Sequence, residues 1–349
     1  MKKARESNIE LLRILTICGV VMLHYNGNVA LGLVTEGTTN YYLLQFLEIL
    51  FICAVNLFVL ISGYFLSTNN NRKAVKALEL VVQVMAIGVG KYLVSVLLGG
   101  PFSLSALLGA AIPNNYYVTL YLAVYLLSPY INLAISRLSD KKFGVLIGLC
   151  GVLFALWPTV LDMVLGLTGR NFNGMYPTNS GGSQFGYSFL NFALMYLLGA
   201  YLRRIGPSRA IYDALGAVAC VGILFVWQLI YAPVARAYSN PFVILLAVFI
   251  FRLFTHVHIQ SRVINTLAKG AFTCFLLHDY FLPHIGIAKV VNGSTVALLG
   301  HILVTIPMIF LICWVVWFVY DLISRPVFRL LEKPLQKVDQ LLSITDNEE

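Results

Sequence analysis

Apolar residues run along this chain in stretches of about twenty, separated by short polar segments. A membrane-spanning α-helix needs about twenty predominantly apolar residues. Windows of that length predict ten spans, over residues 9–26, 42–66, 75–98, 116–135, 143–166, 187–202, 210–231, 242–255, 264–282 and 296–323. The segment Leu104–Ile112 is too short to cross, so we expect a re-entrant or interfacial helix there. The pattern predicts an all-α, polytopic membrane protein.

Positive charge divides unevenly between the two sets of loops. With the N-terminus inside, seventeen Lys and Arg residues fall in inner segments, whereas the outer segments hold only Arg170, Arg236 and Lys289. Cytoplasmic loops of membrane proteins carry such an excess of cations. The bias predicts cytoplasmic N- and C-termini and an even number of spans. The tail, residues 324–349, is expected to lie along the inner surface as an amphipathic helix.

Composition agrees with a membrane protein and argues against a soluble domain, a nucleic-acid-binding protein and a disulfide-rich fold. Hydrophobic residues make up 59% of the chain and charged residues 11%, which lies outside the usage of soluble domains. The net charge of +9 comes from cations in short loops, so no nucleic-acid partner is predicted. The six cysteines all lie in apolar runs, which predicts neither a disulfide framework nor a metal site. One membrane domain covers residues 1–349, with its core at 8–323, and the basic N-terminus is expected to be a retained signal-anchor.

The first span is apolar but carries three ionisable residues, Glu10, Arg13 and His24. Ionisable residues within a span usually face a protein interior and serve a function. From Arg13 to His24 a helix turns about 20° past three full turns and rises about 16 Å, so the two share one face at different depths. Glu10 precedes Arg13 by three residues, within reach of a local ion pair. Interfacial positions for all three residues remain the alternative.

Polar residues in two other spans have candidate roles. In the ninth span, His278 and Asp279 lie near the outer end, at the depth predicted for His24. The two histidines and the carboxylate are therefore expected to meet in one cavity. His278 and Asp279 are adjacent and diverge by about 100° on a helix, so no pairing is expected between them. Ser62 and Gly63 in the second span favour a helix-packing site.

Several further residues receive a structural interpretation from the sequence. Tyr116, Tyr117 and Tyr121 open the fourth span and are typical of an outer aromatic belt. Lys91 and Arg252 are intramembrane cations without an assigned partner, and His256 and His258 are expected at the surface. The long outer loop 168–186 is rich in Asn, Ser, Gly, Tyr and Phe, which suits either sugar binding or ordinary turns.

Four motifs together resemble the acyltransferase 3 family of integral membrane acyltransferases. They are Asn8-Ile-Glu-Leu-Leu-Arg13 followed by ten residues and His24, Phe58-Val-Leu-Ile-Ser62-Gly63, Tyr116-Tyr-Val-Thr-Leu-Tyr with Ser-Pro129 beyond, and Thr273-Cys-Phe-Leu-Leu-His278. The resemblance runs over essentially the whole chain, and the Arg-x10-His element is its most specific part. Tyr117, Thr273 and Cys274 depart from the residues that the family usually shows.

The resemblance implies transfer of an acyl group, usually acetyl from acetyl-CoA, to a hydroxyl of a carbohydrate or other cell-envelope acceptor. It implies a multi-pass protein of the cell membrane, with a bacterial cytoplasmic membrane expected, whose partners are the lipid bilayer, acyl-CoA and a glycan. Arg13 and His24 match the family's essential pair, and Ser62 matches its serine-glycine element. No metal is implied.

We assign expected roles on that basis. His24 is the catalytic base, or a transient acyl carrier, because imidazole titrates near neutral pH. Arg13 contributes to catalysis by holding a CoA phosphate, which a guanidinium fits well. Glu10 orients Arg13, and Ser62 lines the donor pocket. His278 and Tyr117 are expected to contact the substrate.

Two other classes of protein stay open. A secondary transporter would use intramembrane Glu, Arg and His as a proton relay. Against this, the sequence shows no internal repeat and no matching pair of Gly- or Pro-broken spans. A non-catalytic membrane sensor or scaffold is the third class, and no motif favours it.

Overall fold

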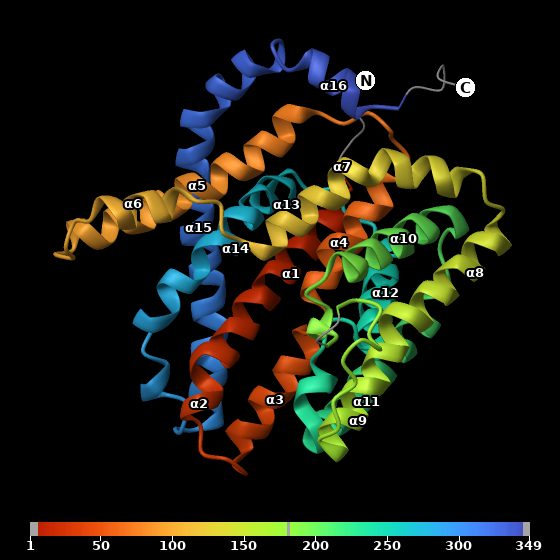
Figure 1. Ribbon diagram of the computed structural model, residues 1–349. Helices are drawn as coiled ribbons and strands as arrows, with labels where there is room; N and C mark the ends of the chain where they lie inside the picture. The colour runs from red at the N-terminus through yellow and green to blue at the C-terminus, as the bar shows by residue number, and fades with distance from the viewer. Residues whose placement is uncertain (1–5, 180–181, 345–349) are drawn as a thin grey trace.

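The computed structural model describes residues 6–179 and 182–344, and this part of the chain is built from helices and turns, with no strand. Figure 1 shows a bundle whose helices run mostly along one direction, with α5, α6 and α7 crossing near one end. The all-α prediction is therefore confirmed.

The α-helices overlap the predicted spans, several of which divide into two helices. The first half of the chain holds α1 (Ser7–Tyr25), α2 (Leu31–Leu33), α3 (Thr39–Phe51), α4 (Ala54–Leu66), α5 (Ala74–Leu97), α6 (Leu104–Ala111), α7 (Tyr116–Ser136), α8 (Asp140–Gly151) and α9 (Trp157–Thr168). The second half holds α10 (Phe189–Ile205), α11 (Ala210–Ala235), α12 (Pro241–Thr255), α13 (Arg262–Leu267), α14 (Ala271–Phe281), α15 (Thr295–Glu332) and α16 (Gln336–Leu342).

Helical stretches long and apolar enough to cross a membrane number seven among the described residues. They are Ser7–Leu33, Thr39–Leu66, Ala74–Leu97, Leu104–Ser136, Asp140–Thr168, Ala210–Ala235 and Thr295–Glu332. The predicted spans 187–202, 242–255 and 264–282 correspond to shorter helices, of which α12 has 15 residues. At 1.5 Å per residue α12 is only about 22 Å long, less than the hydrocarbon thickness. The structure thus supports a multi-pass membrane protein, and the number ten remains a prediction.

The centre of the bundle is the close contact between α4 and α10. A Cβ atom on Gly63 would lie 2.2 Å from the Tyr196 carbonyl oxygen, and one on Gly199 would lie 2.1 Å from the Leu60 carbonyl oxygen. Two backbones approach this closely only where side chains are absent, as small residues allow in membrane helices. The packing interpretation of Gly63 is therefore confirmed, and this contact holds the end of α4 that carries Ser62.

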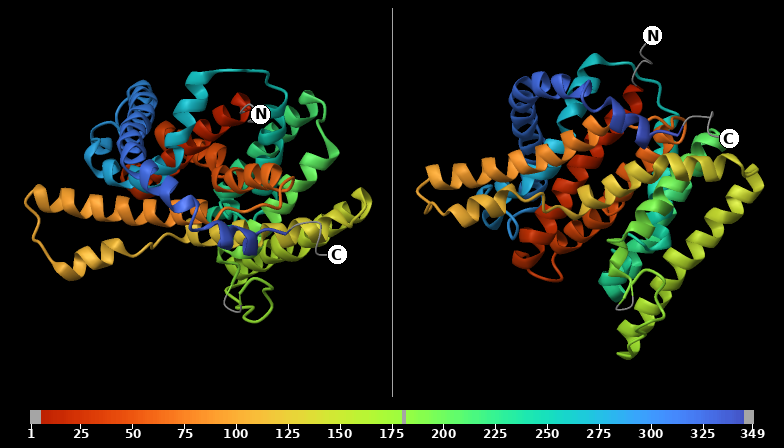
Figure 2. Two further views of the ribbon diagram at one scale, coloured as in Figure 1. Left: turned by 90° about the horizontal axis from the view of Figure 1, so that it is seen from above. Right: turned by 45° about the horizontal axis from the view of Figure 1, so that its top comes forward.

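A hairpin of α5 and α6 projects from the body of the protein (Figure 2). Its tip is apolar and open, with Leu97 84% and Leu98 77% exposed. No Asp, Glu, Lys, Arg or His occurs between Lys91 and Arg137. An uncharged, exposed apolar surface of this length fits hydrocarbon as its surroundings.

Helix α16 and Ser343 pack back onto the start of α5. Helix α15 continues to Glu332, and the short α16 follows it rather than one long tail helix. The Asp339 carboxylate accepts a hydrogen bond from the Ala74 backbone N–H at 2.7 Å, and the Arg72 N–H donates to the Ser343 hydroxyl at 3.0 Å. The start of α1 and α16 lie at the same end of the molecule (Figure 1). The side of the membrane that this end faces stays a prediction.

Candidate functional site

The polar face of α1 forms as its spacing predicts. Arg13 donates from Nη1 to Glu10 Oε1 at 3.1 Å, which confirms the local ion pair. Glu10 is buried at 7% exposure, whereas Arg13 is partly exposed and lies 6.0 Å from the Phe65 ring centroid. The buried Glu10 carboxylate holds one side of the Arg13 guanidinium. The other N–H donors of Arg13 can therefore turn toward a ligand.

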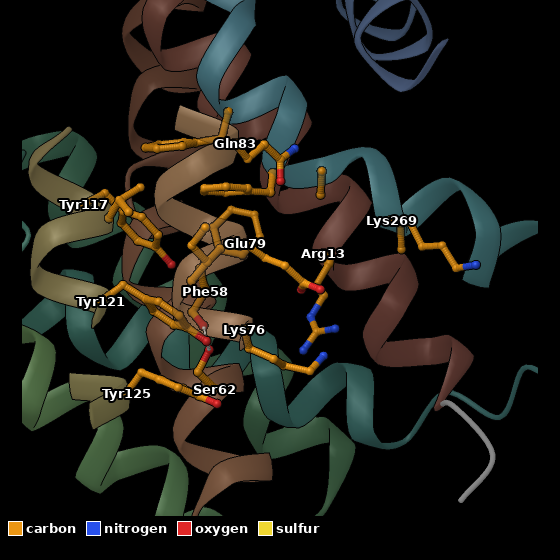
Figure 3. A pocket seen from close by; sticks show the side chains of 16 residues that line it. Arg13, Phe58, Ser62, Lys76, Glu79, Gln83, Tyr117, Tyr121, Tyr125 and Lys269 are labelled. Carbon is orange, nitrogen blue, oxygen red and sulfur yellow. Dashed lines mark hydrogen bonds between the residues drawn. The ribbon is translucent and has the colours of Figure 1, made fainter. Parts of the chain in front are cut away.

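Arg13 borders a cavity of about 380 Å³ between α1, α4, α5, α7 and the start of α14. Figure 3 shows the Arg13 guanidinium and the Lys76 ammonium directed into the same part of this cavity, with the Glu79 carboxylate beside them. Lys269 also belongs to the lining, but its ammonium points away. Two cations that face one space attract an anion, and phosphate satisfies both.

Ser62 lines the same cavity as Arg13, as expected for the serine-glycine element. Its hydroxyl donates to the Phe58 carbonyl oxygen at 2.9 Å and lies 3.5 Å from the Tyr121 hydroxyl. The first bond satisfies the hydroxyl within its own helix, so Ser62 presents an oxygen to the cavity without needing a ligand.

The belt interpretation of Tyr117 and Tyr121 is wrong, because both line the cavity. Tyr117 is 9% exposed and its ring stacks on Tyr121 with centroids 5.9 Å apart. Helix α7 crosses the bundle obliquely, so residues four apart on one face look inward. Tyr116, on another face of α7, is partly exposed and contacts the Tyr187 ring at 4.9 Å.

The second part of the site lies farther along α1, where His24 meets α14. His24 Nδ1 lies 2.6 Å from Asp279 Oδ1 and 2.9 Å from His278 Nε2. The predicted meeting of two histidines and a carboxylate is confirmed. His278 is buried at 1% exposure, whereas the side chains of His24 and Asp279 are 40% and 52% exposed.

One detail of that prediction is wrong, because His278 and Asp279 do approach each other. His278 Nε2 lies 3.1 Å from Asp279 Oδ1. Their Cα–Cβ bonds diverge, but each side chain bends toward the same atom, His24 Nδ1 on the neighbouring helix. A shared third partner thus overrides the 100° offset of adjacent helical residues.

The hydrogen bonds fix the proton positions on the two imidazoles. His278 Nδ1 lies 2.8 Å from the Cys274 carbonyl oxygen, which only accepts, so this nitrogen carries a proton. The Asp279 carboxylate likewise accepts from His24 Nδ1–H. The remaining lone pair of His24 is then on Nε2, which has no hydrogen-bond partner among residues 6–179 and 182–344. Nε2 is the atom free to accept a proton.

The same three ligand atoms lie within 4.8 Å of one another, so they are a conceivable metal set. The Nδ1–H of His24 lies 2.6 Å from Asp279 Oδ1 and 2.9 Å from His278 Nε2, however, so one proton facing two acceptors already satisfies its hydrogen bonding. A proton network accounts for the geometry without an ion.

The cavity and the His24 cluster lie along the same two helices, α1 and α14. On α1, Arg13 and His24 are separated by a helical rise of about 16 Å. On α14 the cavity lining ends at Phe275, and His278 follows three residues later. The Arg13 cavity and the His24 cluster therefore lie at different depths along the same two helices.

Two polar clusters were missed or left unassigned by the sequence. Arg252 pairs with Asp213 at 3.1 Å, and His256 Nε2 lies 3.3 Å from the same carboxylate, so Arg252 has a partner and His256 is no isolated surface residue. Glu48 is buried and accepts from Asn26 Nδ2 at 3.0 Å, just beyond His24. The signal available for Glu48 was a lone carboxylate within an apolar run.

Lys91 also has a partner, because its ammonium donates to the Leu276 carbonyl oxygen at 3.2 Å. This bond ties α5 to α14 two residues before His278. Lys91 therefore has a structural contact that the sequence did not reveal.

The long loop before α10 is tied to α9. Tyr176 donates to Asp162 Oδ1 at 2.9 Å, and Ser183 donates to the other oxygen of that carboxylate. Burial, together with the Asp162 hydrogen bond, raises the pKa of the Tyr176 phenol above its usual range. Residues 180–181 of this loop lie outside the described part of the chain. Its sugar-binding role stays a prediction.

A comparison with protein families adds one finding. A family model described as an acyltransferase domain, the acyltransferase 3 model, matches residues 6–320. A search of curated proteins and a search of solved structures found no match. The matched range begins just before α1 and ends within α15, so it contains both the cavity and the His24 cluster.

Proposed function

The chain belongs to the acyltransferase 3 family, and from this premise we propose that it transfers an acetyl group from cytoplasmic acetyl-CoA to a hydroxyl of a cell-envelope carbohydrate. The protein would act within the cell membrane, with a bacterial cytoplasmic membrane as the expected setting. One observation carries the proposal. Helix α1 joins a cationic cavity at Arg13 to a histidine whose Nδ1 is held by a carboxylate and whose Nε2 is free.

The cavity suits the phosphate end of the donor. Arg13 offers a planar fork of donors and Lys76 a second positive charge, and both face the same space. Glu10 holds the guanidinium in place, and Ser62 adds a hydroxyl oxygen to the wall. From there the thioester arm would follow the aromatic wall toward His24.

His24 is the base in this proposal. Its Nε2 takes the proton of the acceptor hydroxyl while the hydroxyl oxygen attacks the thioester carbon. The tetrahedral intermediate collapses, the carbon–sulfur bond breaks, and the departing thiolate receives the proton from His24. Asp279 stabilises the imidazolium that exists between these steps and fixes the tautomer, as a carboxylate does for histidine bases elsewhere.

The acceptor would reach His24 from its exposed side. His24 and Asp279 are both partly open, whereas His278 is closed in by the protein. His278 therefore contacts the reacting groups through His24 rather than through a broad surface of its own. This favours a positioning role for His278, with Tyr117 acting along the donor path.

The test uses labelled acetyl-CoA and membranes from native cells that lack the chromosomal gene and express variants in trans. Wild type is expected to place label in the envelope glycan fraction, and His24→Ala is expected to lose this activity by about 10²-fold or more. His258→Ala is the matched control, because His258 is exposed and lies outside both parts of the site. A folded His24→Ala protein with full activity contradicts the base assignment. Wild type that never consumes acetyl-CoA, together with proton-coupled uptake in vesicles, favours the transporter.

A further inference from the structure

Helix α5 begins without a capping side chain of its own. Helices α6, α7 and α8 each begin at a Ser or Asn whose side-chain oxygen accepts a hydrogen bond from the first turn. At the start of α5 that position is held by Lys73, whose side chain has no acceptor atom. The N–H groups of a first helical turn have no partner within the helix, so α5 must find its cap elsewhere.

The missing cap comes from the other end of the chain. The Asp339 carboxylate on α16 accepts from the Ala74 N–H at 2.7 Å, across 265 positions of sequence. The Ser343 hydroxyl, just beyond α16, accepts from the Arg72 N–H at 3.0 Å and donates to the Arg72 carbonyl oxygen at 3.4 Å. A carboxylate in this place satisfies an N–H of the first turn and also faces the positive end of the helix dipole.

The segment held by these bonds also forms part of the donor cavity. The Tyr125 hydroxyl accepts from the Lys73 N–H at 3.1 Å, and Tyr125 lines the cavity. Lys76 follows in the first turn of α5, where its N–H bonds to the Lys73 carbonyl oxygen at 3.0 Å, and its ammonium points into the cavity (Figure 3). The position of the Lys76 side chain therefore depends on how the first turn of α5 is held.

We propose that Asp339 and Ser343 form a clamp that holds the first turn of α5, so that Lys76 faces the phosphates of the donor. The inference rests on the proposed function, because it takes Lys76 as a phosphate contact. Asp339 acts through α5 and is a positioning residue. Both clamp residues lie beyond residue 320, where the family match ends, so membership of the family does not imply the clamp.

The clamp affects donor binding rather than the transfer step. Without the Asp339 carboxylate, the first turn of α5 frays and the Lys76 ammonium spends less time in the cavity. Loss of a helix cap shifts such an equilibrium by about 2- to 30-fold. Arg13 and His24 lie on α1, which the clamp does not contact through a hydrogen bond among the described residues, so the chemistry at His24 is retained.

The first experiment measures KM and kcat for acetyl-CoA in the native membranes. Asp339→Ala is expected to raise KM about three- to tenfold and to leave kcat within about twofold. Asp339→Asn keeps an acceptor oxygen, and Asn caps helices about as well as Asp, so its KM is expected within about twofold of wild type. Ser343→Ala removes the other contact and is expected to raise KM about two- to threefold. Gln340→Ala, at an exposed position on the same helix, is the matched control with a wild-type KM.

A double-mutant cycle tests whether Asp339 acts through Lys76. Lys76→Ala alone raises KM, because it removes the cation that the clamp positions. Adding Asp339→Ala to it is expected to raise KM by no more than about twofold further. A further rise of the full three- to tenfold would show that Asp339 acts by another route.

Hydrogen exchange in the purified protein reports on the clamp without any substrate. The amides of residues 74–77 are expected to exchange faster in Asp339→Ala than in wild type, because opening of the first turn exposes them to water. Asp339→Asn and Gln340→Ala are expected to keep the wild-type rate.

The outcomes separate the clamp from the proposed function. Unchanged exchange in Asp339→Ala, or a wild-type KM despite faster exchange, refutes the clamp while acetyl transfer stands. An Asp339→Asn protein as impaired as Asp339→Ala also refutes it, because the charge of the carboxylate and not its cap then matters. If wild type never consumes acetyl-CoA, the proposed function fails, and the role of the clamp in donor binding fails with it.

Discussion

Replacing Asp279 by Asn tests how His24 is held. The amide fits the same space, but its nitrogen can donate to His24 Nδ1, which leaves the proton on Nε2 and blocks the base. The change also removes the negative charge beside the imidazolium. For charges about 4 Å apart this attraction is worth roughly 1 kcal/mol in water and roughly 4 kcal/mol near a protein surface.

The structure decides between these limits. Asp279 is half exposed, while His278 beside it is buried, so an intermediate value applies. We expect Asp279→Asn to lower kcat by about 10²-fold, the lower end of what a general base contributes. The KM for acetyl-CoA is expected to stay within about twofold, because Asp279 lies outside the donor cavity.

The measurement is the initial rate of acetyl incorporation over a range of acetyl-CoA concentrations, in native membranes with equal amounts of each variant. Asp140→Asn is the control, since Asp140 is exposed and lies 3.7 Å from Arg204, and neither residue lines the cavity. A wild-type kcat in Asp279→Asn, alongside an inactive His24→Ala, would show that the carboxylate does not orient the base. A raised KM with unchanged kcat would instead place Asp279 at the donor.

Two further predictions concern the donor and the bundle. Arg13→Lys keeps the charge but loses the planar fork, so the KM for acetyl-CoA is expected to rise about 10- to 100-fold with a smaller change in kcat; an unchanged KM in the same assay would remove Arg13 from the donor site. Gly199→Ala forces a methyl group against the Leu60 carbonyl, and the melting temperature of the purified protein is expected to fall by several degrees. Gly222→Ala on α11, where no atom lies within 4 Å, is expected to leave the melting temperature unchanged or raise it, and equal losses in both variants would contradict the packing account.

Features that depend on one helix were predictable from the sequence. The Glu10–Arg13 pair and the shared face of Arg13 and His24 follow from helical periodicity alone. The equal depth of His24 and His278 followed from counting spans across the membrane. For the residues of α1, the fixed rise and turn per residue of a helix converts sequence spacing into position.

Features that depend on the crossing of helices were not predictable. Tyr117 faces inward because α7 crosses the bundle obliquely, and periodicity does not specify a crossing angle. Asp279 meets His278 because both reach for an atom on another helix. The Asp213–Arg252 pair likewise requires α11 and α12 to be neighbours. Residue spacing along the chain does not predict which helices pack together.

The distance along the chain between the two halves of the His24 cluster has a consequence for how the protein is made. His24 and His278 are separated by 254 positions. At usual rates of synthesis, α1 leaves the ribosome roughly ten to fifty seconds before α14. During that interval His24 is already in the membrane, while the carboxylate that orients it has not been translated. The His24 cluster is therefore incomplete until nearly all of the chain has been inserted, and a product truncated before α14 carries Arg13 and His24 without His278 and Asp279.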